Sequence, residues 1–320
     1  MSKFRFAIMG AASIAEKFCD AVRLTDDCEV IAVAGKNESR LIEFAARQGI
    51  PKYYVGYEEL LKNERPDCVY IAAVTSLHYE LTMMCLSYGV PVLCEKAMFT
   101  TSKEAETAFA LAKEKGVFTM EAMWSRFLPA MQKAKQWVDE GRIGTVRYVD
   151  ARLGFAAGKD PKNRFYNPEL GGGAAYDLGV YAYELSTFML GEDVLEIKPE
   201  VIWSDTGVDI CEHVTLRFEN AIASLGASLS EMMGGRLVIS GDKGLIIVPL
   251  IHFAHEAYLY DSNRHVVEHF VDDVTKNGFV YEVMEAAGCV REGRLESDTV
   301  PHLTTIRCCR MFDEILKTRK

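Results

Sequence analysis

The chain has 320 residues, of which 49% are hydrophobic and 26% are charged, and its formal net charge is −10 at pH 7. This composition is typical of a globular protein with room for two domains. The acidic balance argues against general binding to nucleic acid or to membrane surfaces, since such partners select basic faces.

Nine cysteines are scattered through mostly apolar stretches and form no C-x-x-C pair. This pattern favours reduced, buried thiols over a disulfide framework or a zinc site. The paired histidines at 252/255 and 265/269 lack an acidic or thiol cluster, so no metal site is expected. The apolar runs are too short to span a bilayer, and the first residues lead directly into a strand pattern, so we expect a soluble, cytoplasmic protein.

Short apolar runs alternate with helical patterns over the first 120 residues. Between the first two runs, Ile14, Phe18 and Val22 recur at the spacing of a helix face. The runs are rich in β-branched residues, as strands buried on both faces are: 4–9, 30–34, 68–74, 90–94 and 117–120. This alternation predicts an α/β fold with an N-terminal Rossmann domain, a doubly wound parallel sheet, over residues 1–122.

The pattern changes from residue 123. We expect a helix over 127–140, a strand over 144–155 and a second helix after Gly171-Gly172-Gly173. Strands dominate 200–271, with turns predicted at 219–220, 234–235 and 241–242. A closing helix is marked by four apolar residues at helical spacing: Cys308, Phe312, Ile315 and Leu316. Residues 123–320 are therefore predicted to form a C-terminal α+β domain with an open, mainly antiparallel sheet.

The turn after the first predicted strand carries a degenerate dinucleotide fingerprint. In G-x-G-x-x-G/A terms, Ala12 replaces the second glycine. A helix N-terminus at this place suits a pyrophosphate, so we predict cofactor contacts from four residues: Gly10, Ala12, Ser13 and Ile14. A short turn of small residues without a ligand is the alternative.

The end of the second strand favours NADP, with NAD as the other option. An NAD site places an acidic residue here for the ribose hydroxyls, whereas this chain has Gly35 and Lys36, with Arg40 a turn later. A small residue and a cation suit a 2′-phosphate. The alternative is an ordinary surface lysine.

Two further strand ends are predicted to line the same crevice. Thr75 and His78 follow the strand over 68–74 and are expected to face the cofactor, although a histidine that only starts a helix fits as well. Glu95 and Lys96 follow the strand over 90–94. Lys96 can polarise a carbonyl or hold a hydroxyl during hydride transfer with Glu95 as its support, or the two form a solvated ion pair.

Chemistry-bearing residues also gather in two later segments. Trp124, Arg126 and Phe127 lie where the first domain meets the second. Asp177 and Tyr181 are four apart on a predicted helix, so an acid and a phenol share a face and Tyr181 can serve as proton donor near the Lys96 ammonium. The alternative is a half-buried core tyrosine beside a solvated acid.

The chain resembles the Gfo/Idh/MocA oxidoreductases, and within them the dihydrodiol dehydrogenase and NADP-dependent D-xylose dehydrogenase branch. The resemblance covers nearly the whole chain and rests on GAASIA, TSLHYE, CEKA, EAMWSRFLP and LGGGAAYDLGVY, in that order. It implies a Rossmann domain and a second domain whose open sheet forms a homodimer interface. The family's proline after the lysine, often in the cis form, is Ala97 in this chain, and the histidine of inositol-type members is Tyr181.

Carried over by position, the resemblance implies catalytic roles for Lys96, Asp177 and Tyr181. Trp124, Phe127 and Tyr176 are expected at the substrate, and Trp124, Arg126, Glu95 and Lys96 at the cofactor. The predicted activity is hydride transfer between NADP(H) and a small sugar, polyol or trans-dihydrodiol. Two alternatives stay open: a non-catalytic NADP(H)-binding redox sensor, and a dehydrogenase of a larger glycoside or an imine-type substrate.

Overall fold

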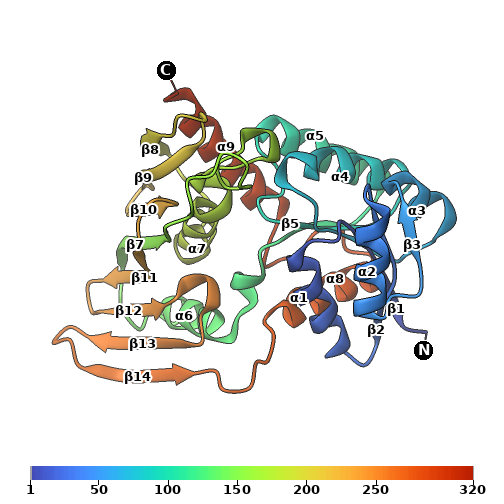
Figure 1. Cartoon of the computed structure of the whole chain (residues 1–320). Coiled ribbons are helices and arrows are strands. Elements are labelled where there is room, and N and C mark those ends of the chain that lie inside the picture. The colour runs from blue at the N-terminus through green and yellow to red at the C-terminus, as the bar shows by residue number, and fades with distance from the viewer. Residues whose placement is uncertain (1, 320) are drawn as a thin grey trace. The chain divides into compact units, whose positions relative to one another are not determined.

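A computed structural model describes residues 2–319 and divides them into two compact units (Figure 1). The first unit comprises the residues up to Phe99, Lys103–Ala122 and Asn277–Thr305. The second comprises Thr100–Ser102, Met123–Lys276 and the residues from Ile306 onward. The long central segment of the second unit begins at Met123, and Asn277–Thr305, which we placed in the second domain, packs with the first unit.

The first unit contains a parallel sheet of six strands in the order β3-β2-β1-β4-β5-β6. The strands are β1 (Phe4–Met9), β2 (Cys28–Gly35), β3 (Tyr53–Val55), β4 (Cys68–Ile71), β5 (Val92–Glu95) and β6 (Thr119–Ala122). The prediction of a doubly wound parallel sheet is confirmed. The edge strand β3 escaped prediction because it has three residues, two of them exposed, and so lacks an apolar run.

Helices connect these strands and bury their apolar sides against the sheet. They are α1 (Ser13–Arg23), α2 (Glu38–Gln48), α3 (Tyr57–Asn63), α4 (His78–Ser87), α5 (Ser102–Lys115) and, from the returning segment, α8 (Phe279–Glu292), with the short turn η1 (Thr75–Leu77). The ring of Phe18 on α1 stacks on Tyr70 of β4 at 3.8 Å between centroids. Packing of this kind on a sheet buried on both faces explains the continuous apolar runs of the sequence.

The second unit contains a mixed sheet of eight strands in the order β14-β13-β12-β11-β7-β10-β9-β8. The strands are β7 (Val146–Gly154), β8 (Glu196–Trp203), β9 (Asp209–Arg217), β10 (Ile222–Ser228), β11 (Met233–Gly241), β12 (Gly244–Pro249), β13 (Glu256–Asp261) and β14 (Val266–Val271). All neighbours pair antiparallel except β7 with β10, which confirms a mainly antiparallel sheet. The predicted turn at Gly234-Gly235 is wrong: both residues lie inside β11, where the register with β7 shifts between Met233 and Arg236.

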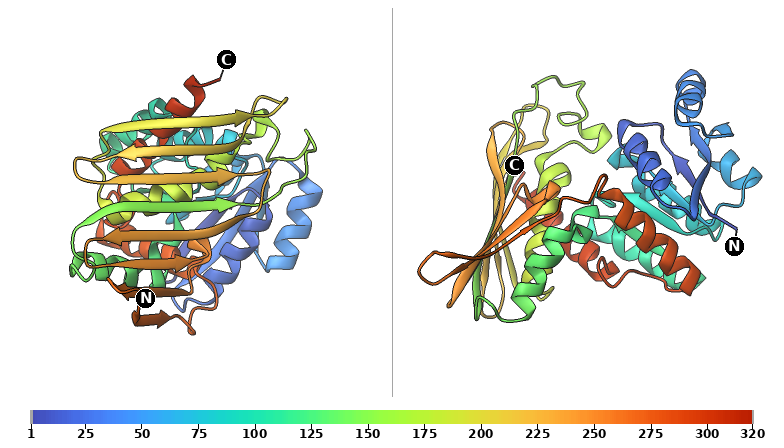
Figure 2. Two further views of the ribbon diagram at one scale, coloured as in Figure 1. Left: turned by 90° about the vertical axis from the view of Figure 1, so that its left-hand side faces the viewer. Right: turned by 90° about the horizontal axis from the view of Figure 1, so that it is seen from below.

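One face of this sheet is covered by helices of the same unit, and the other is open (Figure 2). The helical elements are η2 (Trp124–Phe127), α6 (Pro129–Asp139), η3 (Pro168–Leu170), the π-helical turn η4 (Ala175–Gly179), α7 (Val180–Leu190), η5 (Ile251–Phe253) and α9 (His302–Lys317), which begins in the first unit. Within residues 2–319, none of the helices combines the length and apolar character needed to cross a membrane.

Candidate functional site

The turn from β1 to α1 is built around Gly10, which has φ +111°. A β-carbon at this position would lie 2.6 Å from the carbonyl oxygen of Ala72 and 2.8 Å from the nitrogen of Ala73, the two residues that follow β4. The strand order reverses between β1 and β4, and this is where ligands bind in doubly wound folds. Glycine is therefore required at Gly10, because the backbone passes directly over the end of the neighbouring strand.

The first turn of α1 is suited to a pyrophosphate. Ala12 is the N-cap and makes no side-chain capping bond, so the amides that open the helix have no side-chain acceptor from the cap residue. Ser13 is exposed and Ile14 half-buried at the start of the helix. The residues predicted to hold the phosphates thus fit a dinucleotide at this turn.

The end of β2 brings a cation to the same turn. Arg40 on α2 donates from Nε to the carbonyl oxygen of Ala11 at 2.8 Å, and its backbone N–H is capped by Asn37 at 3.0 Å. Gly35 is buried, and Lys36 is exposed beside it. Arg40 thus brings a cation to the turn after β1, and Lys36 is a second cation at the end of β2.

His78 joins the ends of two strands of the first unit. Its ring is buried, with Nδ1 2.9 Å from the carbonyl oxygen of Ala97 and Nε2 3.1 Å from that of Ala73. Burial lowers the pKa of His78, against the two carbonyl contacts, which raise it. The contact with Ala97 supports a role for His78 in holding the turn that contains Lys96. A direct cofactor contact from His78, or from Thr75 in η1, stays a prediction.

Glu95 is the last residue of β5 and Lys96 follows it, in an environment very different from that of a solvated ion pair. The Glu95 side chain is buried and accepts a hydrogen bond from the Tyr70 hydroxyl. Burial raises the pKa of Glu95, while the Tyr70 hydrogen bond and the Lys96 ammonium lower it. Lys96 itself is half-buried, and its peptide bond to Ala97 is cis.

In the second unit, Tyr181 lies in a cluster of rings on η2, α7 and η5. The indole N–H of Trp124 donates to the Tyr181 hydroxyl oxygen at 3.2 Å, and both side chains are buried. Phe253 meets the Trp124 ring edge to face at 5.0 Å, and the His252 ring lies 5.9 Å from that of Tyr181. The Tyr181 oxygen thus lies beside a wall of rings and accepts a hydrogen bond from the indole. It can keep this hydrogen bond when the phenol is deprotonated to the phenolate.

Asp177 lies in the π-helical turn η4, not in a regular α-helix as predicted, directly before the helix that carries Tyr181. Its carboxylate pairs with Arg164 at 3.0 Å, and the Arg164 guanidinium stacks on Phe165 at 4.0 Å. Tyr176 donates from its hydroxyl to the carbonyl oxygen of Thr100 at 3.3 Å. π-Helical turns are frequent at functional sites.

The loop before this turn is capped by Asp209 of β9. Its carboxylate accepts the backbone N–H of Ala175 at 2.6 Å. A β-carbon on Gly173, which has φ +135°, would lie 2.3 Å from the carboxylate. Burial raises the pKa of Asp209 to about 6, against the backbone N–H groups of Ala175 and Ala174, which lower it. The glycine-rich loop is therefore shaped to admit a carboxylate that fixes the segment bearing Asp177.

Arg126, predicted at the cofactor, is buried within the second unit. Its guanidinium pairs with Glu184 at 3.0 Å and donates to the Thr187 hydroxyl at 3.0 Å, both on α7. These contacts account for Arg126 as a buried structural cation, and a cofactor contact from it stays a prediction. Phe127, beside it at the end of η2, is half-buried.

Sequence reasoning missed several residues that surround the predicted groups. Arg164 and Asp209 lie far from their partners along the chain, and His252 was weighed only as a metal ligand. A single arginine in a loop or an aspartate opening a strand has no sequence signal that distinguishes it from a surface residue. Only the packing brings them to Asp177, Ala175 and Tyr181.

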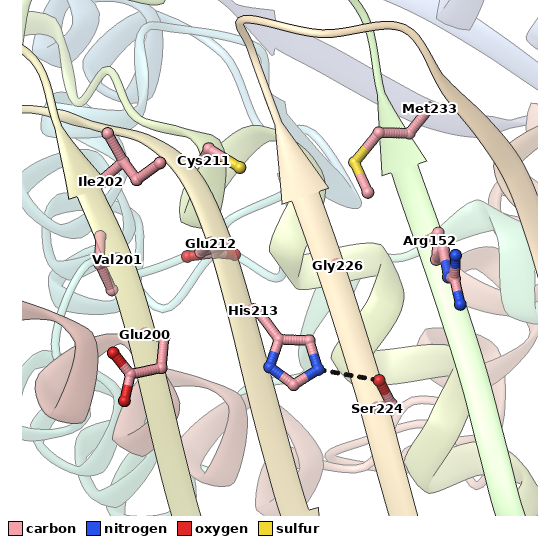
Figure 3. A pocket seen from close by; sticks show the side chains of 10 residues that line it. All are labelled: Arg152, Glu200, Val201, Ile202, Cys211, Glu212, His213, Ser224, Gly226 and Met233. Carbon is pink, nitrogen blue, oxygen red and sulfur yellow. Dashed lines mark hydrogen bonds between the residues drawn. The ribbon is translucent and has the colours of Figure 1, made fainter.

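The open face of the second unit's sheet carries a hollow of about 550 Å³ (Figure 3). Its lining is mixed, with Glu200, Arg152, Ile202 and Met233 around a hydrogen bond of 2.9 Å between His213 and Ser224. Exposed apolar side chains continue on the same face, among them Ile202, Tyr148 and Ile222.

Comparison with known proteins relates both parts of the chain to oxidoreductases. Residues 4–123 match an oxidoreductase family with an NAD-binding Rossmann fold, and residues 131–247 match the GFO/IDH/MocA C-terminal domain. The chain is 32% identical over 309 residues to the trans-1,2-dihydrobenzene-1,2-diol dehydrogenase of Mus musculus, covering 93% of this chain and 91% of the relative. The corresponding enzyme of Xenopus tropicalis is 28% identical and covers 98% and 97%.

Solved structures share the fold at lower identity. An aldose-aldose oxidoreductase from Caulobacter crescentus, complexed with glycerol, has a TM-score of 0.89 at 24% identity and covers 99% of this chain and 97% of its own. A levoglucosan dehydrogenase in complex with NADH and levoglucosan has a TM-score of 0.88 at 18% identity, with the same coverage.

Proposed function

The chain belongs to the Gfo/Idh/MocA family of NAD(P)-binding oxidoreductases, and from that premise we propose that it interconverts a hydroxyl and a carbonyl on a small sugar, polyol or trans-dihydrodiol. The mouse and frog relatives are named for a trans-dihydrodiol, and the structural neighbours for aldoses and levoglucosan. The observation that carries the proposal is the hydroxyl of Tyr181, held by the Trp124 indole against a wall of rings. Such a wall suits the apolar face of a sugar or diol, and the phenol supplies a proton donor beside it.

When bound, a nicotinamide cofactor would supply the hydride acceptor or donor. When an alcohol is oxidised, its carbon gives up a hydride and its hydroxyl gives up a proton. In this direction Tyr181 starts as the phenolate, takes that proton and becomes the phenol, while Lys96 stabilises the developing alkoxide. Asp177 orients the hydroxyl through a hydrogen bond. In the reverse direction, Tyr181 returns the proton to the carbonyl oxygen.

Turnover with a defined panel tests this proposal. We expect absorbance change of NADP(H) with a member of a panel of aldoses, polyols and trans-dihydrobenzenediol, and a loss of kcat of at least about 100-fold in Lys96→Met and in Tyr181→Phe. Tyr183→Phe is the matched control, since this buried tyrosine lies on the same helix and its hydroxyl has no hydrogen-bond partner among the described residues. If Lys96 and Tyr181 act on one substrate, the double variant should lose far less than the product of the two single losses.

The outcomes separate the competing functions. Cofactor binding without turnover of any panel member, or of larger glycosides and imines assayed beside the panel, supports a redox sensor and contradicts a dehydrogenase. Turnover of larger glycosides or imines, and of no aldose, polyol or diol, contradicts the proposed substrate class but still supports a dehydrogenase. Full activity in Tyr181→Phe removes Tyr181 from the mechanism.

We further propose that the cofactor is NADP(H) in preference to NAD(H). The support is the buried Gly35 with the exposed Lys36 beside it, and Arg40 at the phosphate turn. Lys36→Ala combined with Arg40→Ala is expected to raise KM for NADP at least about tenfold while changing KM for NAD little, because only NADP carries the 2′-phosphate. Lys103→Ala, at an exposed lysine, is the control. Equal losses with both cofactors would contradict the preference.

We also propose that two copies associate through the open sheet face of the second unit. Its exposed apolar side chains, Ile202 foremost with 60% of its surface exposed, support a self-complementary interface. Light scattering should give the mass of a dimer for the wild type and of a monomer for Ile202→Glu, with Ile42→Glu on α2 as the control. A monomeric wild type contradicts the interface.

The nine cysteines are free thiols, eight of them buried. On this basis we propose a reducing compartment, the cytoplasm, for the protein. Fractionation of the source cells tests the location.

A further inference from the structure

The turn that carries Lys96 leads into a buried segment of the first unit. Ala97, Met98 and Phe99 follow the lysine and are each exposed by 1% or less, whereas Lys96 itself is half-buried. Strand β5 ends at Glu95, so the backbone groups of these residues lie beyond its ladder. Buried backbone groups of this kind need hydrogen-bond partners from other parts of the chain.

Glu121 of β6 supplies the partner for one of these groups. Its Oε1 accepts the backbone N–H of Met98 at 2.9 Å, and its Oε2 accepts the Thr305 hydroxyl at 2.8 Å. The side chain is buried, with 2% of the residue exposed. Glu121 lies opposite Cys94 in the pairing of β6 with β5, so its carboxylate extends from the strand to the turn beyond the end of β5. Both oxygens are therefore engaged, one by the turn and one by the first turn of α9.

His78 holds the other end of the same peptide unit. Its Nδ1 lies 2.9 Å from the carbonyl oxygen of Ala97, and that carbonyl belongs to the same planar unit as the N–H of Met98. Holding both the oxygen and the N–H of one plane fixes the orientation of that plane. Two buried side chains, one from α4 and one from β6, thus clamp the peptide unit that begins one residue after Lys96.

The backbone before Lys96 is held as well. Glu95 pairs with Ala122 in the ladder of β5 with β6, and its side chain accepts a hydrogen bond from the Tyr70 hydroxyl. The chain is therefore fixed by buried groups on both sides of the lysine. An ammonium that stabilises a developing alkoxide must be held within about 0.5 Å of the productive geometry, and the backbone from which it extends sets that position.

We propose that Glu121 is a positioning residue for Lys96: by accepting the N–H of Met98 it fixes, together with His78, the course of the turn from which the Lys96 side chain extends. The inference rests on the proposed function of Lys96. A merely structural role for Glu121 would lower stability when the side chain is lost, but it would leave the contribution of Lys96 to turnover unchanged.

Hydrogen exchange of the whole protein tests the hold directly, without any substrate. Glu121→Met fills a similar volume but offers the Met98 N–H no carboxylate, so we expect this amide to exchange at least about tenfold faster than in the wild type. Ser297→Ala is the matched control, because Ser297 is buried in the same unit and its hydroxyl oxygen accepts the N–H of Thr299 at 3.0 Å. This control should leave the exchange of Met98 unchanged. Equal exchange of Met98 in Glu121→Met and the wild type overturns the inference.

The effect on Lys96 is measured with the panel substrate that the wild type turns over fastest. Glu121→Met should lower kcat at least about tenfold and keep KM for NADP within about threefold, whereas Glu121→Gln, which retains an acceptor for Met98, should keep kcat within about threefold. Ser297→Ala should keep the kcat of the wild type. Because a positioning residue acts through Lys96, adding Glu121→Met to Lys96→Met should lower kcat by less than about twofold further. The same loss in both backgrounds means a merely structural role and overturns the inference.

A second variant covers the case in which Glu121→Met does not fold. Glu121→Asp keeps the carboxylate but shortens the side chain by one methylene, so it can no longer bridge Met98 and Thr305. Its kcat should fall and its Met98 amide should exchange faster, and wild-type values for both overturn the inference. Full activity in Lys96→Met would instead refute the proposed function, while the exchange of Met98 still decides whether Glu121 holds the turn.

Discussion

Gly10→Ala tests whether the turn after β1 is fixed by the approach of the β4 end. The added β-carbon would lie 2.6 Å from Ala72 O, and an ordinary contact of 3.4 Å requires a shift of about 0.8 Å between backbone segments that cannot rotate away. The backbone conformation at φ +111° costs an alanine about 1–3 kcal/mol, and the forced packing adds about 1–3 kcal/mol. The free energy of unfolding should therefore fall by about 2–6 kcal/mol.

The same shift displaces the amides that open α1, so NADPH should bind at least about tenfold more weakly, equivalent to about 1.4 kcal/mol. Urea unfolding and a fluorescence titration with NADPH measure the two effects. Gly49→Ala is the matched control: its φ is +67°, nothing lies within 4 Å of the added carbon, and it should cost about 1–2 kcal/mol without weakening NADPH. Gly10→Ala behaving like Gly49→Ala in both assays would refute the reasoning.

Three further predictions concern buried polar groups. Burial raises the pKa of Glu212, so the folded state binds more protons than the unfolded state. The free energy of unfolding should therefore fall as pH rises above about 4.3, by up to about 1.4 kcal/mol per pH unit. Urea unfolding at about pH 5 and about pH 8 should show that Glu212→Gln removes this contribution, and the same pH dependence in the variant and the wild type would contradict it. Arg126→Met leaves Glu184 buried without this cation and should lower the free energy of unfolding by about 3–5 kcal/mol in thermal unfolding. Adding Glu184→Leu should restore most of that free energy, and no restoration would contradict the pairing. His78→Phe frees the Ala97 carbonyl and should lower kcat at least about tenfold with NADPH affinity nearly kept, whereas an unchanged kcat would show that the ring does not hold the Lys96 turn.

Local patterns in the sequence were sufficient for most of the fold. Strands buried on both faces read as unbroken apolar runs, so the parallel sheet and its order of helices and strands followed from periodicity. Gly234-Gly235 misled the prediction because a glycine pair signals a turn and a bulge alike, and the ladder with β7 decides between them.

The residues expected to carry the chemistry were chosen because they lie at strand ends or share a short segment. Gly10 and Lys96 each come directly after a strand of the parallel sheet, and Glu95 is the last residue of β5. Tyr181 and Trp124 were singled out separately, and their hydrogen bond is a finding of the structure.

By itself, the sequence determined the class of fold, the family and the sheet edge at which Lys96 follows β5. The tertiary structure decided what surrounds these groups: that Asn277–Thr305 returns to the first unit, that the Tyr70 hydroxyl donates to Glu95, and that Asp209 caps the turn bearing Asp177. The physical reason lies in the range of the interactions. Periodicity and turn chemistry act between residues a few positions apart, whereas burial and charge act between residues that only the packing of distant segments brings together.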